Sequence, residues 1–334
     1  MSASVAETEA LRHGAGAFRA RRDVLAVDGP DAETYLQGQL SQDLGGLAVG
    51  ASADSLLFEP DGKLSALLRV TRRDGQSFVL DVEGGYGEAV TARLRRFLLR
   101  SKVEIDAIPL QCLSLRGHAV GDAAAGLLTV LAERGVLALP FAWNGWTGVD
   151  LLGPGDVVLA PEAADLPAGV VACGAEAVEA CRIASGIPAM GAELTNKTIA
   201  AEAGLVERTV SFTKGCYTGQ ELVARIDSRG SNVARRLVGV IASEGPPEGD
   251  PLARGMTLHA GAAPAGDGPA DDKVVGSITS AAWSPELGAW AALGYLHRNV
   301  DAPGPVRVRS GEGIGASWPA RVATLPMVPG TEGS

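Results

Sequence analysis

Hydrophobic and polar positions divide the first part of the chain into short strands and two helices. An apolar run at residues 24–27 leads into a turn at Gly29, and Pro30 followed by acidic residues is typical of a helix start. Three strand-like runs follow over residues 54–85, separated by Pro-Asp-Gly and Arg-Asp-Gly turns, which indicates an antiparallel meander. A basic helix over 87–102 and one further strand over residues 103–117 complete an α+β pattern.

The C-terminal part of the chain has a different pattern. Residues 119–166 mix a small-residue helix with strands, and residues 175–188 predict a helix that ends at Gly186. After Arg236, short apolar runs punctuated by Gly and Pro predict strands without a long helix. We therefore expect a small antiparallel barrel or sandwich that begins near residues 234–238.

Length and composition narrow the class of protein. A chain of 334 residues is too long for one ordinary core, so we expect two or three domains. Apolar residues make up 46% and charged residues 20%, a composition typical of folded chains. The formal net charge of −10 argues against a protein that coats nucleic acid or an anionic membrane. No segment has the apolar length of a signal peptide or a spanning helix, which favours a cytoplasmic protein.

The cysteines and histidines are few and scattered. Four cysteines show no Cys-x-x-Cys pair, and four histidines lie far apart, so neither a disulfide framework nor a stable metal site is expected. Cys112, Cys173 and Cys181 lie in apolar surroundings and are predicted to be core residues. The remaining cysteine, Cys216, has a different neighbourhood.

Cys216 lies within the segment "VSFTKGCYTGQELVAR", residues 210–225. Thr218 and Glu221 fit a capping box, which predicts a helix with Thr218 as its N-cap. Cys216 would then lie beside the unpaired N–H groups of that helix, with the ammonium of Lys214 close by. Both features favour a thiolate over a thiol.

The same segment has two further features and one open alternative. Gly215 and Gly219 permit a close approach of the backbone to the sulfur, and Glu221 and Arg225 have the spacing of a helical ion pair. A single cysteine before a helix is also commonly a packed apolar residue. The residues alone leave both interpretations of Cys216 open.

"KGCYTGQE", residues 214–221, resembles the signature of the YgfZ family, a branch of the folate-binding fold of the glycine-cleavage T-protein. The likeness extends over most of residues 22–298, because further segments resemble the family in the same order. These segments are "YLQGQLSQDL", "PDGKLSALLRV", "RRFLLRSKVEI", "RIASGIPAMGAELTNKTIAAEAGLVERTVSF" and "GSITSAAWSPELGAWAALGYLHR".

The resemblance implies a T-protein-like, multidomain α+β ring around a central cavity the size of a folate. Residues 1–50 together with 140–235 would form a discontinuous folate-binding-fold domain that carries the motif. Residues 51–139 would form an α+β insertion domain, and residues 236–330 a C-terminal antiparallel β-barrel.

The resemblance also implies a function, namely a folate-binding accessory factor for assembly or repair of iron–sulfur clusters. Its ligand would be tetrahydrofolate or a derivative. Its partners would be iron–sulfur client enzymes or cluster-assembly proteins, with no nucleic acid and no membrane. Matched position by position, the resemblance implies two catalytic residues, the reactive thiol Cys216 and Lys214, supported by Gly215, Tyr217, Thr218, Gly219, Gln220, Glu221 and Arg225.

The candidate folate contacts are Gln37, Gln39, Arg182 and Tyr217, although Gln37 and Gln39 are equally typical of a polar helix end. A four-iron cluster normally takes four protein ligands, so Cys216 alone would contact a cluster only transiently. A basic run on the helix over 87–102 either binds an acidic partner or a polyglutamate tail or is a solvated helix face; its residues are Arg93, Arg95, Arg96, Arg100 and Lys102.

Two departures from the family pattern bear on the reaction. T-proteins carry an aspartate pair near the positions of Ser65 and Ala66, so a general base for aminomethyl transfer is missing there. Ala184 stands where many relatives carry a glutamate suited to a pterin edge. A tetrahydrofolate-dependent one-carbon transferase, of the aminomethyl type, is therefore the alternative function, and a thiol enzyme without folate is a third. Whether the protein is an enzyme at all stays open.

Overall fold

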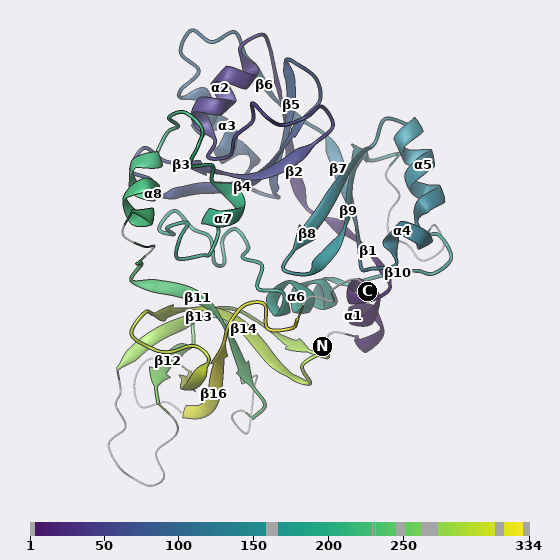
Figure 1. Ribbon diagram of the computed structural model, residues 1–334. Helices are drawn as coiled ribbons and strands as arrows, with labels where there is room; N and C mark the ends of the chain where they lie inside the picture. The colour runs from purple at the N-terminus through teal and green to yellow at the C-terminus, as the bar shows by residue number, and fades with distance from the viewer. Residues whose placement is uncertain are drawn as a thin grey trace.

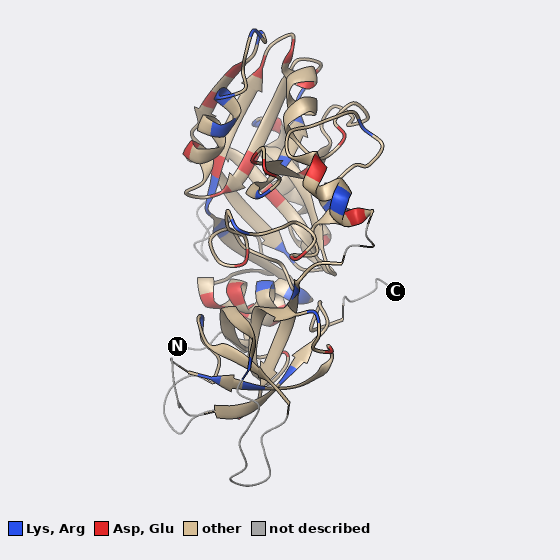
Figure 2. Ribbon diagram, turned by 90° about the vertical axis from the view of Figure 1, so that its left-hand side faces the viewer, with Lys and Arg blue, Asp and Glu red and all other residues tan. Residues whose placement is uncertain are grey.

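One antiparallel sheet, one mixed sheet and a closed barrel form three lobes, which Figure 1 shows around the middle of the molecule. The short helix α6 lies above the barrel in both ribbon views (Figure 1, Figure 2) and packs on strands β13 and β14. In the view of Figure 2, Lys and Arg are interspersed with Asp and Glu along the ribbon. The computed structural model describes residues 4–157, 166–228, 230, 232–244, 251–261, 273–310 and 317–329.

The meander sheet has the strand order β3-β4-β5-β2-β6, with every neighbouring pair antiparallel. The Pro-Asp-Gly and Arg-Asp-Gly turns join β3 to β4 and β4 to β5, so the predicted meander is confirmed. Helices α2 and α3 pack on it and bury an apolar core that includes Leu36, Phe58 and Leu94. Its elements are β2 (Arg22–Asp28), α2 (Ala32–Gln39), β3 (Ser52–Phe58), β4 (Leu64–Arg72), β5 (Ser77–Glu83), α3 (Gly87–Arg95) and β6 (Glu104–Ile108).

The lateral sheet has the strand order β10-β1-β7-β9-β8, in which only the β1–β10 pair is parallel. The single strand expected over residues 103–117 is wrong, because Pro109 has no N–H for a ladder and separates β6 from β7. The two strands then enter different sheets. The elements here are α1 (Val5–Arg12), β1 (Ala15–Ala20), β7 (Leu110–Arg116), α4 (Val120–Ala123), α5 (Ala125–Glu133), β8 (Leu137–Trp143), β9 (Trp146–Pro154), β10 (Val170–Ala172) and α6 (Ala175–Ala184).

The C-terminal strands close into an antiparallel barrel of order β11-β14-β13-β12-β15-β16. The predicted α+β class with a C-terminal barrel is thus confirmed. Its first strand begins at Arg235, within the predicted boundary, and alternate inward side chains such as Val240 and Leu296 fill its core. The short helices α7 (Val206–Thr209) and α8 (Gln220–Asp227) precede it, followed by β11 (Arg235–Ala242), β12 (Thr257–Ala260), β13 (Val274–Ser284), β14 (Ala289–His297), β15 (Gly304–Arg309) and β16 (Ser317–Ala323).

The sheets cut across the predicted domain limits. Strand β2, from the expected segment 1–50, pairs with β5 and β6 of the expected insertion 51–139. Strand β7, also from that insertion, pairs with β1 and β9 of the lateral sheet. Each sheet thus combines strands from both segments, while the division into domains stays a prediction.

A buried ion cluster, here called the clamp, joins the two sheets. Arg69 of β4 contacts Asp81 on β5 through Nε at 2.9 Å and Asp150 on β9 through Nη1 at 2.8 Å. Asp150 also accepts from Nη2 of Arg116 on β7 at 2.8 Å, and Arg22 of β2 donates through Nε to Asp81 at 2.7 Å. Charged side chains buried this deeply are tolerated only when each finds a partner, and here the partners lie on opposite sheets.

The clamp also sets the ionisation of its members. Burial on its own would raise the pKa of Asp150, but Arg116 and Arg69 outweigh it and hold that pKa below the usual range. The hydroxyl of Ser114 donates to the same carboxylate at 2.6 Å. With three guanidiniums and two carboxylates, the clamp carries a net charge of +1.

A second buried carboxylate, Glu193, attaches the barrel to the rest of the chain. Its side chain is 0% exposed. Oε1 accepts the hydroxyls of Thr279 and Ser280 on β13, both at 2.6 Å. Oε2 accepts from the Ala189 N–H at 2.9 Å and from Nη1 of Arg182 on α6 at 3.0 Å. Four donors from three parts of the chain therefore converge on one carboxylate.

We expect Asp150→Asn to lower the free energy of unfolding by about 3–5 kcal/mol, because it leaves buried guanidiniums without their counter-charge. Since the pKa of Asp150 is depressed in the folded protein, its contribution is present above about pH 4 and is lost as pH falls below that. The difference in the free energy of unfolding between the native protein and Asp150→Asn should therefore be smaller in acid. Urea unfolding at pH 7 and pH 3.5 measures both effects.

The exposed Asp156 lies on the same segment and supplies the matched control. Asp156→Asn should change stability by less than about 0.5 kcal/mol. Equal stability of the Asp150 and Asp156 variants would contradict the structural role of the clamp.

We expect Glu193→Ala to loosen the barrel where Thr279 and Ser280 lie. A hydrogen bond to a charged group contributes about 1.5–3 kcal/mol, so amide exchange in β13 should accelerate at least about tenfold. Hydrogen-exchange mass spectrometry checks this against Glu207→Ala, an exposed glutamate on α7. Unchanged protection of β13 in the Glu193 variant would count against this attachment.

Candidate functional site

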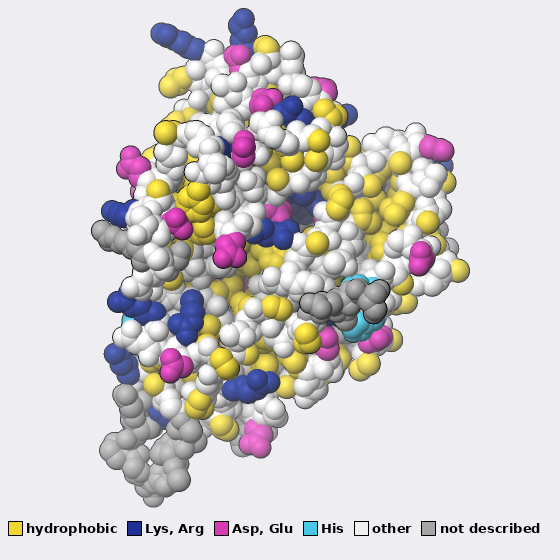
Figure 3. Space-filling view, viewed as in Figure 1, with side chains coloured by type: hydrophobic (Ala, Val, Ile, Leu, Met, Phe, Trp, Pro, Cys, Tyr) yellow, Lys and Arg dark blue, Asp and Glu magenta, His cyan; other side chains and the backbone are white. Residues whose placement is uncertain are grey.

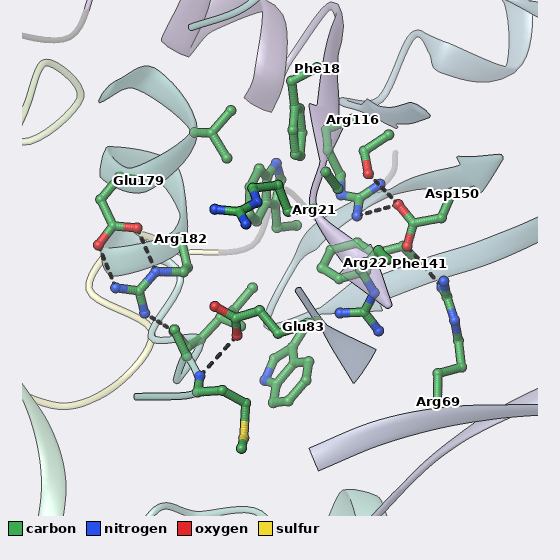
Figure 4. Close-up of a pocket in the computed structure, with 18 of the residues that line it drawn as sticks. Phe18, Arg21, Arg22, Arg69, Glu83, Arg116, Phe141, Asp150, Glu179 and Arg182 are labelled. Atoms are coloured by element: carbon green, nitrogen blue, oxygen red, sulfur yellow. Dashed lines mark hydrogen bonds and ion pairs between the residues drawn. The ribbon is translucent and has the colours of Figure 1, made fainter. Parts of the chain in front are cut away.

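A central cavity of about 510 Å³ lies between the meander sheet, the lateral sheet and α6. Figure 3 shows the hollow in the middle of this face, with basic and acidic side chains at its floor and hydrophobic ones around it. Figure 4 shows that its walls combine aromatic rings, guanidiniums and carboxylates from strands far apart in the sequence. The clamp residues Arg22, Arg69, Arg116 and Asp150 form part of this lining.

The aromatic wall comes from the β8–β9 hairpin. Trp143 and Trp146 face each other across a tight turn in which Asn144 and Gly145 have positive φ values of 49° and 78°. The Trp146 and Phe141 rings lie edge to face at 5.8 Å, and the Arg116 guanidinium lies 3.7 Å over Phe141. Trp146 belongs to a buried apolar cluster against which Trp143 packs, and both residues also line the cavity.

Carboxylates from positions other than Ser65 and Ala66 line the cavity. At the end of β5, Glu83 is half-buried and its Oε2 accepts the Met190 N–H at 2.9 Å. Asp54 on β3 pairs with Arg208, and Glu179 on α6 pairs with Arg182 at 2.6 Å. Ser65 and Ala66 themselves supply no carboxylate; Glu83 does so from the neighbouring part of the sheet.

Arg182 lies on the cavity wall, as a folate contact should, but its guanidinium is occupied by protein groups. It donates to both oxygens of Glu179, to the Ile187 carbonyl and to Glu193. Its neighbour Ala184 is buried and offers no polar group. Arg182 thus positions α6 against the barrel.

The other three expected folate contacts are not among the residues that line the cavity. Gln37 donates to Asp43 and accepts from the Leu44 N–H at 2.8 Å. Gln39 is buried and accepts from Arg93 at 3.1 Å. Tyr217 is buried against Phe58, with ring centroids 6.3 Å apart. Their role toward a folate stays a prediction.

The motif segment lies on the C-terminal end of α2 and the β3–β4 turn. Nζ of Lys214 donates to the carbonyls of Leu40 at 2.7 Å and Gln42 at 2.8 Å, in the segment that directly follows α2. Partial burial lowers the pKa of Lys214 to about 8, although Asp43 acts to raise it. No hydrogen bond or ion pair joins Lys214 to Cys216 among the described residues.

The predicted capping box is wrong. Helix α8 begins after Gly219, which is its N-cap with φ of 83° and provides no side-chain cap. Thr218 instead faces α2, and its N–H donates to the Gly38 carbonyl at 3.0 Å. A Cβ at Gly219 would lie 2.6 Å from Phe58 Cβ, so glycine is required by both space and conformation.

The remaining motif residues have mostly local roles. Gln220 accepts the Tyr217 N–H at 3.1 Å, whereas Gly215, Glu221 and Arg225 are exposed. Within the part of the chain that the structure describes, Glu221 and Arg225 form no ion pair within 4.0 Å. The expected helical pair is therefore not made.

The four cysteines are free, and they differ in exposure. Burial raises the pKa of Cys112 and Cys181 to about 12, and burial with Glu7 raises that of Cys173 to about 11. Cys173 is only half-buried and lines the cavity, so its assignment to the core is wrong. Cys216 is exposed, and it is not among the cavity-lining residues.

The basic helix is structural at its centre. Arg93 is buried and donates to the Phe58 carbonyl at 2.6 Å, so it is unavailable to an acidic partner. Across the described ranges, no group of three or more His, Cys, Asp or Glu residues is placed to hold a metal. None of the described helices has the length and apolarity needed to cross a membrane.

Sequence reasoning missed the clamp and the cavity walls. The available signal was a charge inside an apolar strand, such as Arg69 in "ALLRV" or Asp150 in "GVDLL". Such a residue must be paired when the strand is buried, which predicts a partner but not its identity.

Comparisons with known proteins agree on the fold. Residues 235–328 match the glycine cleavage T-protein C-terminal barrel domain. The crystal structure of the glycine cleavage system aminomethyltransferase T from Bartonella henselae superposes with a TM-score of 0.77 at 22% identity, covering 97% of this chain and 89% of that one. An aminomethyltransferase from Streptomyces avermitilis is 27% identical over 95% of this chain and 87% of its own.

Two relatives share higher identity over a shorter region. An uncharacterized protein from Haemophilus influenzae is 30% identical over 216 residues, which are 63% of this chain and 67% of that protein. The tRNA-modifying protein YgfZ from Klebsiella pneumoniae is 30% identical over 214 residues, 62% of this chain and 65% of that protein. The match thus spans about two thirds of the length of these relatives. Together with the T-protein fold and barrel, these likenesses show that the chain belongs to the YgfZ family.

Proposed function

We propose that this protein is a folate-binding accessory factor for the assembly or repair of iron–sulfur clusters in client enzymes. The observation that carries the proposal is the central cavity, whose volume of about 510 Å³ is in the range of pockets that bind ligands of folate size. Tetrahydrofolate or a derivative would occupy it, and Cys216 would act on the client outside it.

The cavity walls suit the chemistry of a reduced folate. Phe141 and Trp143 offer flat apolar surfaces for a pterin ring, whose amino-pyrimidine edge donates hydrogen bonds. Glu83 is the carboxylate we assign to that edge, because only one of its oxygens is occupied by a backbone N–H. The net positive clamp favours the anionic glutamate end of the ligand.

Cys216 would act on cluster iron or sulfur at the surface. Its exposure permits contact with another protein, and its place outside the cavity separates thiol chemistry from folate binding. Because a four-iron cluster normally takes four ligands, the other ligands would come from the client or a cluster-assembly protein. The cluster is then cargo that Cys216 contacts during transfer or repair.

One relative is named a tRNA-modifying protein, and the net charge of this chain bears on whether it binds RNA itself. A formal net charge of −10 disfavours direct binding to RNA. We therefore place any connection with tRNA modification in a client enzyme, with this protein maintaining the cluster of that enzyme.

A tetrahydrofolate-dependent one-carbon transferase is the second candidate. The Glu83 carboxylate on the cavity wall supports it, since general-base or amine-orienting work needs such a group. Turnover of an aminomethyl donor with tetrahydrofolate, lost in Glu83→Gln, would favour this candidate over the accessory factor.

Two variants separate the two halves of the proposal. Glu83→Gln should weaken binding of 5-formyltetrahydrofolate at least about tenfold in calorimetry, since it removes a charge-assisted hydrogen bond. Cys216→Ala should bind that folate as the native protein does, yet fail to restore the activity of a four-iron client enzyme in cells lacking the protein.

Thr213→Ala changes an exposed neighbour in the same segment and should restore client activity fully. Full restoration by Cys216→Ala would remove the thiol from the proposed function. Failure of the native protein to bind reduced folates would remove the ligand.

A further inference from the structure

Two hollows of the molecule meet at one short segment. The central cavity and a second hollow of about 240 Å³ share residues 19–22, at the junction of β1 and β2. The second hollow is further lined by Asp23, Gly84 and the start of β7. An extended ligand in the central cavity could therefore continue over this junction without crossing the core.

The junction presents two arginines without counter-charges. Arg22 is held by Asp81, whereas Arg19 and Arg21 are exposed and have no ion pair or side-chain hydrogen bond among the described residues. Arg19 lies near the end of β1 and Arg21 lies between β1 and β2, and both line the central cavity and the second hollow. Figure 4 shows Arg21 reaching into the central cavity.

We propose that Arg19 and Arg21 form a binding site for the γ-linked polyglutamate tail of a folate. The inference rests on the proposed function, because it places the pterin in the central cavity and leads the tail toward the second hollow. Each added γ-glutamyl unit carries one carboxylate on a flexible chain. Two guanidiniums on the lining that both hollows share match two such carboxylates.

The surroundings of the site favour an anion. The carboxylate on the wall of the second hollow, Asp23, is already bound by the N–H groups of Gly85 and Gly87, both at 2.8 Å. Gln111 of β7 adds an exposed amide that can donate to the tail. Because both arginines are exposed, each contact should be modest in strength and sensitive to salt.

The test compares 5-formyltetrahydrofolate as the monoglutamate and as the tri-γ-glutamate, titrated calorimetrically against the full chain. The native protein should bind the triglutamate about tenfold more tightly at low salt, about threefold for each engaged pair. Arg19→Gln and Arg21→Gln should each reduce this ratio to about three, and the double variant should reduce it to about one. High salt should abolish the gain in the native protein.

Arg73→Gln, an exposed arginine at the β4–β5 turn, is the matched control and should keep the native ratio. A ratio near one in the native protein, or a native ratio retained by the double variant, would overturn the tail site alone. Failure to bind either folate would overturn the proposed function and the tail site together.

Discussion

The contact between Arg69 and Asp150 is the interaction on which the rest of the structure depends. Nη1 of Arg69 on the meander sheet lies 2.8 Å from Oδ2 of Asp150 on the lateral sheet, and both residues line the central cavity. Packing alone would close the space between two sheets, because apolar faces pack without voids. A charged cluster instead fixes their separation through directional bonds, and its aromatic and arginine neighbours become cavity walls. The same charges that hold the sheets together leave a positive floor for an anionic ligand.

The second organising feature is the separation of the cavity from the exposed thiol. The "KGCYTGQE" segment holds its backbone in place through Lys214 and Thr218, which bind carbonyls at the end of α2. Its glycine and lysine therefore explain how the loop is shaped more directly than how the sulfur is activated. In the proposed function, folate binding in the cavity and sulfur chemistry at the surface can then be varied independently. This arrangement fits a factor that must meet a large partner while it holds a small ligand.

Local patterns predicted the parts of the fold that depend on local chemistry. The Pro-Asp-Gly turn predicts the meander because turn geometry is local, and Gly/Pro-punctuated runs predict the barrel. The partners of Arg69 could not be predicted, since Asp150 lies far along the chain and the pairing depends on tertiary contact. Thr218 is not the cap for the same reason, because both its N–H and its hydroxyl face the Gly38 carbonyl on α2. The motif identified the family and Cys216, while the cavity walls became visible only in three dimensions.

The most direct test of the account maps where a reduced folate binds. Hydrogen exchange of the full chain with and without 5-formyltetrahydrofolate should show protection at residues 18–22, at the end of β5 near Glu83 and in the β8–β9 hairpin. These segments surround the cavity on both sheets. Protection confined to residues 210–221, or no protection anywhere, would contradict a folate site built on the clamp.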